Sequence, residues 1–235
     1  MKRMTTQQAS LPQIVTAEKW QKARDELLVA EKEATRTLDA LAARRRRLPM
    51  VRFGTGYTFD SPDGPKSLLD LFDGRNEMVL YQFMDNGPDH FCPGCSWWTA
   101  NMPSTAPAIL ADKGITWVHV SDMPLAQIEA LKARMGWTIP FVSSHGTSFT
   151  RDTGAGGGFL LNVFLRDGDD VYRTYTTTAR GYERLAFVTS ILDLTVYGRR
   201  EDWEDSPPSW PQHPTYIIPT TMNPRQVPTG YGTFR

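Results

Sequence analysis

The sequence predicts an α/β fold, a central mixed sheet flanked by helices, with a long helix before it and an extended tail after it. Three observations support this prediction. Residues 1–47 form an arm that contains one long helical repeat, residues 48–198 alternate between strand-like and helical segments, and residues 199–235 are rich in proline with little periodic apolar pattern. We therefore expect one domain over residues 48–198, between an N-terminal arm and a C-terminal tail.

The N-terminal arm is expected to be one long helix. Residues 16–47 contain no Gly or Pro, Thr16 is a suitable N-cap, and Pro49 ends the pattern. The apolar positions recur at three- and four-residue steps and are Trp20, Ala23, Leu27, Ala30, Ala34, Leu38 and Leu41. Such a narrow stripe indicates packing on the domain surface or on a partner subunit, so we expect a possible homodimer through this helix.

Between residues 48 and 198 the chain alternates between strands and helices. Continuous apolar runs of strand length indicate buried strands, and Pro or Gly marks most helix ends. The expected elements are, in chain order, a hairpin or turn at 57–64, a short helix at 67–75, a strand at 78–84, a bent helix at 96–114, a strand at 115–121, a helix at 124–136, a hairpin at 158–178 and a helix at 181–194.

The order strand, helix, strand, helix, hairpin, helix is the core topology of the thioredoxin fold. The tetrapeptide CPGC at residues 92–95 follows the first buried strand and opens the first helix, and it holds the only two cysteines of the chain. A thiolate at a helix N-terminus is stabilised by free backbone N–H groups and by the helix dipole, which lowers its pKa. We therefore expect Cys92, at the exposed end, to be the nucleophile and Cys95 to resolve the mixed disulfide.

Other interpretations of the same residues stay open. Cys92, Cys95 and His90 together are candidates for copper or zinc ligands. The two cysteines are otherwise a structural pair, or the chain is a partner-binding module without enzymatic activity. A peroxiredoxin-like thiol peroxidase is a further alternative, although Asp89 occupies the place of the threonine in the PxxxTxxC pattern.

Two neighbouring features add hypotheses about the surroundings of the dithiol. Trp97 and Trp98 are candidates for an apolar platform for a partner, but helix geometry points them in different directions, so at least one is expected in the core. Residues 154–158 are either a flexible loop beside the site or a plain linker.

Charge and hydropathy exclude some classes of partner. The chain has 26 basic and 26 acidic residues, which gives no reason to expect binding to nucleic acid. The four arginines at 44–47 lie at a predicted helix end, where cations oppose the helix dipole. The longest apolar runs have strand length, far short of the roughly 20 residues of a membrane helix. The N-terminus lacks the apolar stretch of a secretory signal, so we expect a cytoplasmic protein.

Several blocks of the chain, in order, resemble the bacterial "domain of unknown function 899" family of the thioredoxin-like superfamily. The resemblance is carried by LPQIVTAEKWQKARDELLVAEKEATR, CPGCS, RMGWTIPFVSS, VFLRDGDDVYRTYTTTARG and LDLTVYGRRED. It implies a thioredoxin-like fold and dithiol chemistry. From the residues and this resemblance together we expect a thiol-disulfide oxidoreductase that acts through Cys92 and Cys95, needs no bound cofactor, and has protein or small-molecule thiols and disulfides as partners.

Overall fold

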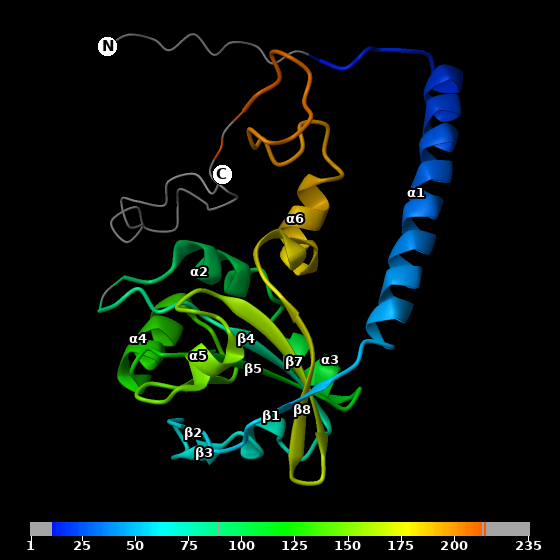
Figure 1. The fold of residues 1–235 in the computed structure, drawn as a ribbon. Helices are drawn as coiled ribbons and strands as arrows, with labels where there is room; N and C mark the ends of the chain where they lie inside the picture. The colour runs from blue at the N-terminus through cyan, green and yellow to red at the C-terminus, as the bar shows by residue number, and fades with distance from the viewer. Residues whose placement is uncertain (1–10, 89, 213, 215–235) are drawn as a thin grey trace, which may run out of the picture.

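The structure is a computed structural model, which describes residues 11–88, 90–212 and 214 (Figure 1). Its strands are β1 (Val51–Phe53), β2 (Thr58–Phe59), β3 (Lys66–Ser67), β4 (Glu77–Gln82), β5 (Ile115–Ser121), β6 (Phe141–Ser143), β7 (Leu160–Asp167) and β8 (Asp170–Thr177). Its α-helices are α1 (Ala17–Arg45), α2 (Pro93–Ala100), α3 (Ala106–Ala111), α4 (Leu125–Met135), α5 (Phe149–Thr153) and α6 (Phe187–Leu192). Short 3-10 helices lie at Asp70–Phe72, Ala179–Gly181 and Glu183–Leu185.

The main sheet has six strands in the order β1-β8-β7-β4-β5-β6. β4 lies near its centre, parallel to β5 and antiparallel to β7, and β7 forms a hairpin with β8. The four strands β5-β4-β7-β8 have the order and directions of the thioredoxin core, so the predicted mixed sheet and fold class are confirmed. β6 extends one edge, and the short β1 extends the other by pairing with β8.

The helix predicted at 96–114 is wrong as a single bent helix. The chain forms two separate helices instead, α2 and α3, with a turn between them. Pro103 explains the break, because a proline has no N–H and disfavours helical geometry in the residue before it, whereas Pro107 lies in the first turn of α3, where a proline is tolerated. The final helix is likewise shorter than predicted, since residues 183–185 form a 3-10 turn and α6 begins only at Phe187.

Each face of the sheet carries its own hydrophobic cluster. We call one the dithiol core: it contains both cysteines and the residues Tyr81, Phe83, Phe91, Trp97, Trp98, Trp117, Met123, Ile128, Leu131, Phe141, Leu161, Tyr182 and Ala186. We call the other the phenylalanine core: Phe53, Phe59, Leu68, Leu71, Phe72, Met78, Leu80, Val118, Val120, Val142, Phe149, Phe164 and Val171. Successive residues of β4 and β5 alternate between the two clusters, as side chains of a strand must.

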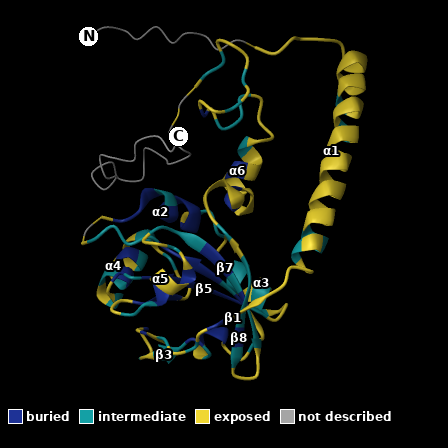
Figure 2. Cartoon of the chain, viewed as in Figure 1, coloured by how far each residue is buried: buried dark blue, intermediate teal, exposed yellow. Residues whose placement is uncertain are grey.

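Helix α1 is the predicted long helix, and it stands apart from the domain (Figures 1 and 2). The Thr16 hydroxyl accepts a hydrogen bond from the Lys19 N–H at 3.4 Å, which confirms the N-cap. At the other end Arg47 donates to the Ala43 carbonyl at 2.8 Å, as expected for cations at a helix end. None of the residues of α1 is buried, so the expected packing on the domain surface is wrong.

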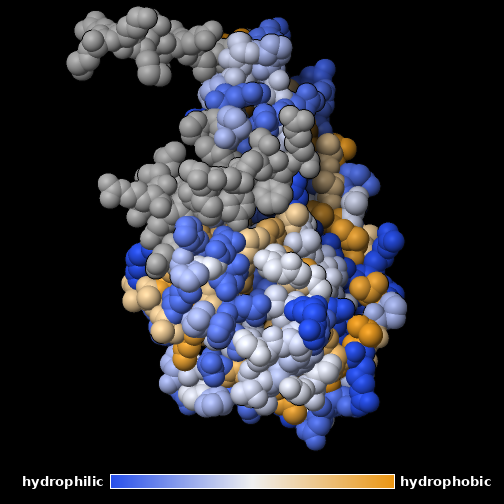
Figure 3. All heavy atoms as spheres, turned by 60° about the vertical axis from the view of Figure 1, so that its left-hand side comes forward, coloured by the Kyte–Doolittle hydropathy of each residue, from blue (hydrophilic) through white to orange (hydrophobic). Residues whose placement is uncertain are grey.

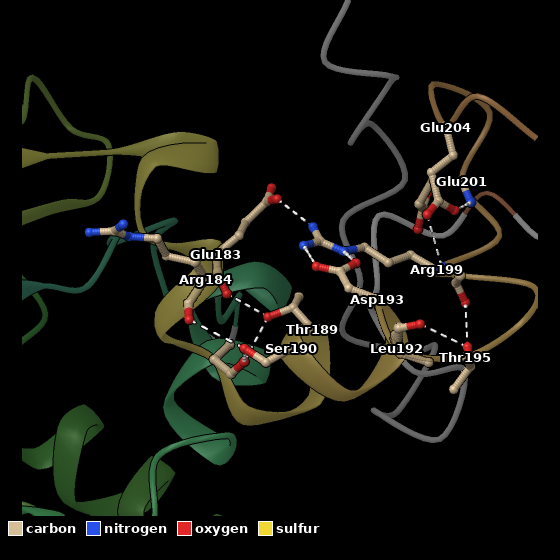
Figure 4. A network of polar contacts seen from close by, with 12 residues as sticks. Glu183, Arg184, Thr189, Ser190, Leu192, Asp193, Thr195, Arg199, Glu201 and Glu204 are labelled. Atoms are coloured by element: carbon tan, nitrogen blue, oxygen red, sulfur yellow. Dashed lines mark hydrogen bonds and ion pairs between the residues drawn. The ribbon is translucent and has the colours of Figure 1, made fainter. Parts of the chain in front are cut away.

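The beginning of the predicted tail is attached to the domain through a network of charged side chains (Figure 4). Arg199 donates to Glu183 at 2.7 Å and makes two bonds of 2.6 Å to Asp193. The Glu204 carboxylate accepts from the N–H groups of Arg199 and Glu201. Residues 199–204 are therefore a fixed part of the structure rather than a loose extension; the predicted tail from 215 to 235 lies outside the described residues.

Candidate active site

The two cysteines lie at the start of α2, where the sequence predicts them. Cys92 is the N-cap: its sulfur accepts a hydrogen bond from the Cys95 N–H at 3.3 Å. Pro93 occupies the first turn, where the absence of an N–H costs nothing. The local sequence therefore begins the helix with a sulfur atom in the place usually taken by a serine or aspartate oxygen.

The two cysteines are not joined by a disulfide, and both are buried, with relative exposures of 1% for Cys92 and 0% for Cys95. The expectation of an exposed Cys92 is wrong. Phe91, Trp98 and Tyr182 belong to the same buried cluster as the two sulfurs. A molecule in solution therefore reaches the Cys92 sulfur only when a neighbouring segment moves.

One such segment is the loop between β4 and α2. Its ends are joined by an antiparallel bridge between Asp85 and Phe91. The Asp85 carboxylate accepts from the Gly87 N–H at 2.8 Å, and Gln127 of α4 donates to the Gly87 carbonyl at 3.1 Å. The guanidinium of Arg134, also on α4, lies 4.6 Å from the centre of the Phe91 ring. Helix α4 thus holds the loop that precedes the dithiol.

His90 does not join the two sulfurs. It is exposed, and its Nδ1 lies 2.7 Å from the Pro88 carbonyl. Within residues 11–88, 90–212 and 214, no three side chains of His, Cys, Asp or Glu are grouped so that they could hold a metal ion. The third ligand that the metal alternative requires is therefore not brought to the site in this structure.

Trp97 and Trp98 are both buried, with relative exposures of 7% and 4%. Trp98 stacks on Tyr81 with ring centres 4.3 Å apart, and on Trp117 at 5.7 Å. The expectation that at least one of them is a core residue is confirmed, and neither forms an exposed platform. Polar and apolar residues are interspersed over the face of the molecule that Figure 3 shows.

Burial governs the acidity of Cys95. Removal from water, together with the neighbouring Cys92, raises the pKa of Cys95 well above its ordinary value, while the Tyr81 hydroxyl and the Met84 N–H act in the opposite direction. Burial also raises the pKa of Tyr81 well above its ordinary value, so this phenol stays protonated at neutral pH. The second cysteine is thus a neutral thiol surrounded by groups that favour its thiolate.

The ring of His119, on β5, packs against the ring of Tyr81 and is neutral. Its burial lowers its pKa to about 3. The Trp117 indole donates to its Nδ1 at 3.1 Å, so Nδ1 carries no proton and Nε2–H is left to donate to the Thr99 hydroxyl at 3.2 Å. A fixed imidazole therefore links β5 to α2 one turn beyond the dithiol.

Sequence reasoning missed Tyr81 and placed His119 only within a strand pattern. Both lie in continuous apolar runs, which hide the individual polar atom. The sequence does contain a signal for them, because side chains alternate between the two faces of a strand. Residues 79, 81 and 83 of the predicted strand at 78–84 share one face, as do residues 117 and 119 of the predicted strand at 115–121.

The fold and this site define the class: a thioredoxin-like protein whose two cysteines open the helix after the first core strand. A sequence-family model described as "Bacterial protein of unknown function (DUF899)" matches residues 9–216. The chain belongs to this family. A comparison with curated proteins gives no match.

Solved structures with similar folds have low sequence identity. Peroxidoxin BcpB from Mycobacterium tuberculosis is 18% identical, with a TM-score of 0.39 over 54% of this chain and 86% of that one. A putative thiol:disulfide interchange protein DsbE from Chlorobium tepidum is 14% identical, with a TM-score of 0.41 over 58% and 94%. An uncharacterized thioredoxin-like protein from Porphyromonas gingivalis is 18% identical, with a TM-score of 0.41 over 63% and 91%. None of the described helices is long and apolar enough to cross a membrane.

Proposed function

We propose that this protein is a thiol-disulfide oxidoreductase in which Cys92 attacks a substrate disulfide and Cys95 resolves the mixed disulfide. The observation that carries the proposal is the placement of both thiols in the first turn of α2, with the Cys92 sulfur 3.3 Å from the Cys95 N–H. The dipole and free N–H groups of a helix start stabilise a thiolate there. No bound cofactor is needed, because the two sulfurs carry both electrons.

The burial of Cys92 adds a step to this cycle. We infer that the loop at 85–91 moves before the substrate reaches the sulfur, because Phe91 packs in the dithiol core and Gln127 and Arg134 of α4 hold the loop closed. The hydrogen bond to Gly87 and the cation–π contact with Phe91 are both made by side chains of α4, and such contacts suit a segment that opens to admit a partner.

Oxidation of the reduced protein by oxidised glutathione tests the proposal, with mass spectrometry after acid quenching as the readout. The wild-type chain is expected to form an internal disulfide, and Cys95→Ser to accumulate one glutathione on Cys92. Cys92→Ser is expected to react far more slowly. The proposal is overturned when Cys92→Ser takes up glutathione at the wild-type rate, or when the wild-type chain forms no internal disulfide.

The predicted homodimer stays a prediction, and α1 supplies its rationale. Trp20, Leu27, Leu38 and Leu41 are between 37% and 58% exposed along this helix. A helix of 29 residues with none buried gains little from packing within its own chain. Sedimentation of the full chain, compared with Leu27→Glu, is expected to show a dimer that the substitution weakens; a monomeric wild-type chain would contradict it.

The cytoplasmic location and the thiol or disulfide partners are also proposals. A dithiol that must be regenerated by other thiols suits a reducing compartment. Fractionation of the native cells, with detection of the untagged chain, is the corresponding measurement.

A further inference from the structure

The hydroxyl of Tyr81 is a buried polar group without an ordinary partner. Tyr81 and Cys95 are both fully buried in the dithiol core, and the Tyr81 hydroxyl lowers the pKa of the Cys95 thiol. This hydroxyl has no hydrogen-bond partner in the described part of the chain. A buried phenol in this condition costs free energy unless something else uses its proton.

The ring of Tyr81 is fixed so that the hydroxyl cannot easily turn elsewhere. It stacks on Trp98 at 4.3 Å and meets the edges of His119 at 5.1 Å and Tyr182 at 6.1 Å. Trp98 lies three residues after Cys95 on the same helix, so the residue that holds the ring also belongs to the element that carries the thiol. The hydroxyl is thus held in place before any reaction.

A second donor reaches the same sulfur from the main chain. The Met84 N–H interacts with Cys95 from the segment just after β4. Two donors from consecutive parts of the chain therefore favour the thiolate of a cysteine that lies away from water. This is the arrangement by which proteins stabilise a negative charge that develops during a reaction.

We propose that the Tyr81 hydroxyl and the Met84 N–H together stabilise the thiolate of Cys95 as it forms in the resolving step, which makes Tyr81 a catalytic residue. The inference rests on the proposed function and deepens it. Tyr81 remains a phenol throughout and acts as a hydrogen-bond donor, not as a base.

In the overall reaction that the resolving step completes, a substrate disulfide is the oxidant. Cys95 loses its proton to solvent, and its thiolate attacks the Cys92 sulfur of the mixed disulfide. A Cys92–Cys95 bond forms, the bond between Cys92 and the substrate sulfur breaks, and the substrate leaves as a thiolate that takes up a proton. Two protein thiols are oxidised and one substrate disulfide is reduced.

Stopped-flow reaction with 5,5′-dithiobis(2-nitrobenzoate) separates the two steps. The first thionitrobenzoate is released when Cys92 attacks, at a rate that depends on reagent concentration. The second is released when Cys95 resolves, at a rate that does not. Tyr81→Phe keeps the ring and is expected to slow only the second release, by about four- to fifteenfold at neutral pH, since a lost hydrogen bond to a thiolate is partly offset by the greater nucleophilicity of a more basic thiol.

The pH profile distinguishes this role from a structural one. In Tyr81→Phe the second release is expected to regain the wild-type rate at high pH, where Cys95 ionises without help, whereas a displaced thiol would be slow at every pH. Tyr57→Phe is the matched control, because its half-buried hydroxyl donates to Asp152 at 3.1 Å and belongs to the other face of the sheet. Denaturant unfolding checks that both variants fold.

Two outcomes overturn the inference in different ways. An unchanged second release in Tyr81→Phe removes the role of Tyr81 and leaves the dithiol cycle standing. A wild-type chain without a concentration-independent second release removes the proposed function, and the inference with it.

Discussion

The two faces of the sheet hold cores of similar extent and different chemistry. The phenylalanine core is made of apolar side chains, and its aromatic rings meet edge to face, as Phe59 and Phe149 do at 4.9 Å. The dithiol core contains the two thiols, two phenols and three indoles, against which a neutral imidazole packs. Polar atoms in a dry interior cost free energy, and here they surround the two sulfurs. The comparison teaches that one face provides stability while the other also positions reactive groups.

The largest effect is expected from Phe164→Ala in the phenylalanine core. Phe164 is completely buried and packs on Phe53 at 5.1 Å, so its truncation leaves a cavity and lowers the free energy of unfolding by about 3–5 kcal/mol. Urea unfolding measures this change. The rate of thionitrobenzoate release per folded molecule is expected to stay unchanged, and a tenfold slower release would break the proposed division between the two faces.

A somewhat smaller effect is expected from Arg199→Leu. Arg199 and Glu183 form an ion pair in which the side chains are 8% and 9% exposed, so removal of the arginine leaves a buried carboxylate and costs about 3 kcal/mol. Glu183 follows Tyr182 of the dithiol core, so we also expect faster alkylation of Cys92 in this variant.

Arg180→Leu is the control for that variant. Arg180 also pairs with Glu183, at 3.5 Å, but its side chain is 54% exposed, so its loss is expected to cost less than about 1 kcal/mol. Equal losses in the two variants, measured by urea unfolding, would contradict the assignment of the buried pair to Arg199.

Over the range from pH 7 to 5, the smallest effect is the pH dependence that His119 gives to the dithiol core. Its pKa is about 3 in the folded chain and near 6.5 in the unfolded chain. The unfolded chain therefore binds the additional proton in this window, and stability falls as pH drops below 6.5, by about 1.4 kcal/mol per pH unit down to pH 3. Denaturant unfolding between pH 7 and 5 is expected to show a shallower loss in His119→Gln than in the wild-type chain; identical slopes would contradict a neutral buried imidazole.

Much of the fold follows from local sequence signals. Thr16 and the uninterrupted helix formers after it fix α1, and Gly136, at φ 68°, ends α4 where the sequence predicts. The strands β4 and β5 and the β7–β8 hairpin are predicted from continuous apolar runs and a turn at Gly168. Each of these elements is determined by a few neighbouring residues, so it can be predicted without tertiary information.

The missed features depend on contacts between distant segments. β1 has only three residues, and it becomes a strand through its pairing with β8, more than a hundred residues away. The burial of Cys92 results from its place in a cluster that includes Tyr182, a residue far away in the sequence, so no local pattern predicts it. The effect of Tyr81 on the pKa of Cys95 depends on both the face of the strand and the position on the helix. The sequence thus locates the two cysteines and leaves their environment to the tertiary structure.

The capping role of the Cys92 sulfur links the reduction potential to helix formation. A thiolate is a stronger acceptor for the Cys95 N–H than a sulfur bonded to another sulfur, so the start of α2 is capped best in the reduced, ionised protein. Stabilisation of the reduced form makes a dithiol more oxidising. If the sulfur cap is assigned the free energy of an oxygen cap, the start of α2 raises the potential by about 10 to 40 mV. The same contact that begins a helix therefore also shifts the reduction potential of the Cys92–Cys95 pair.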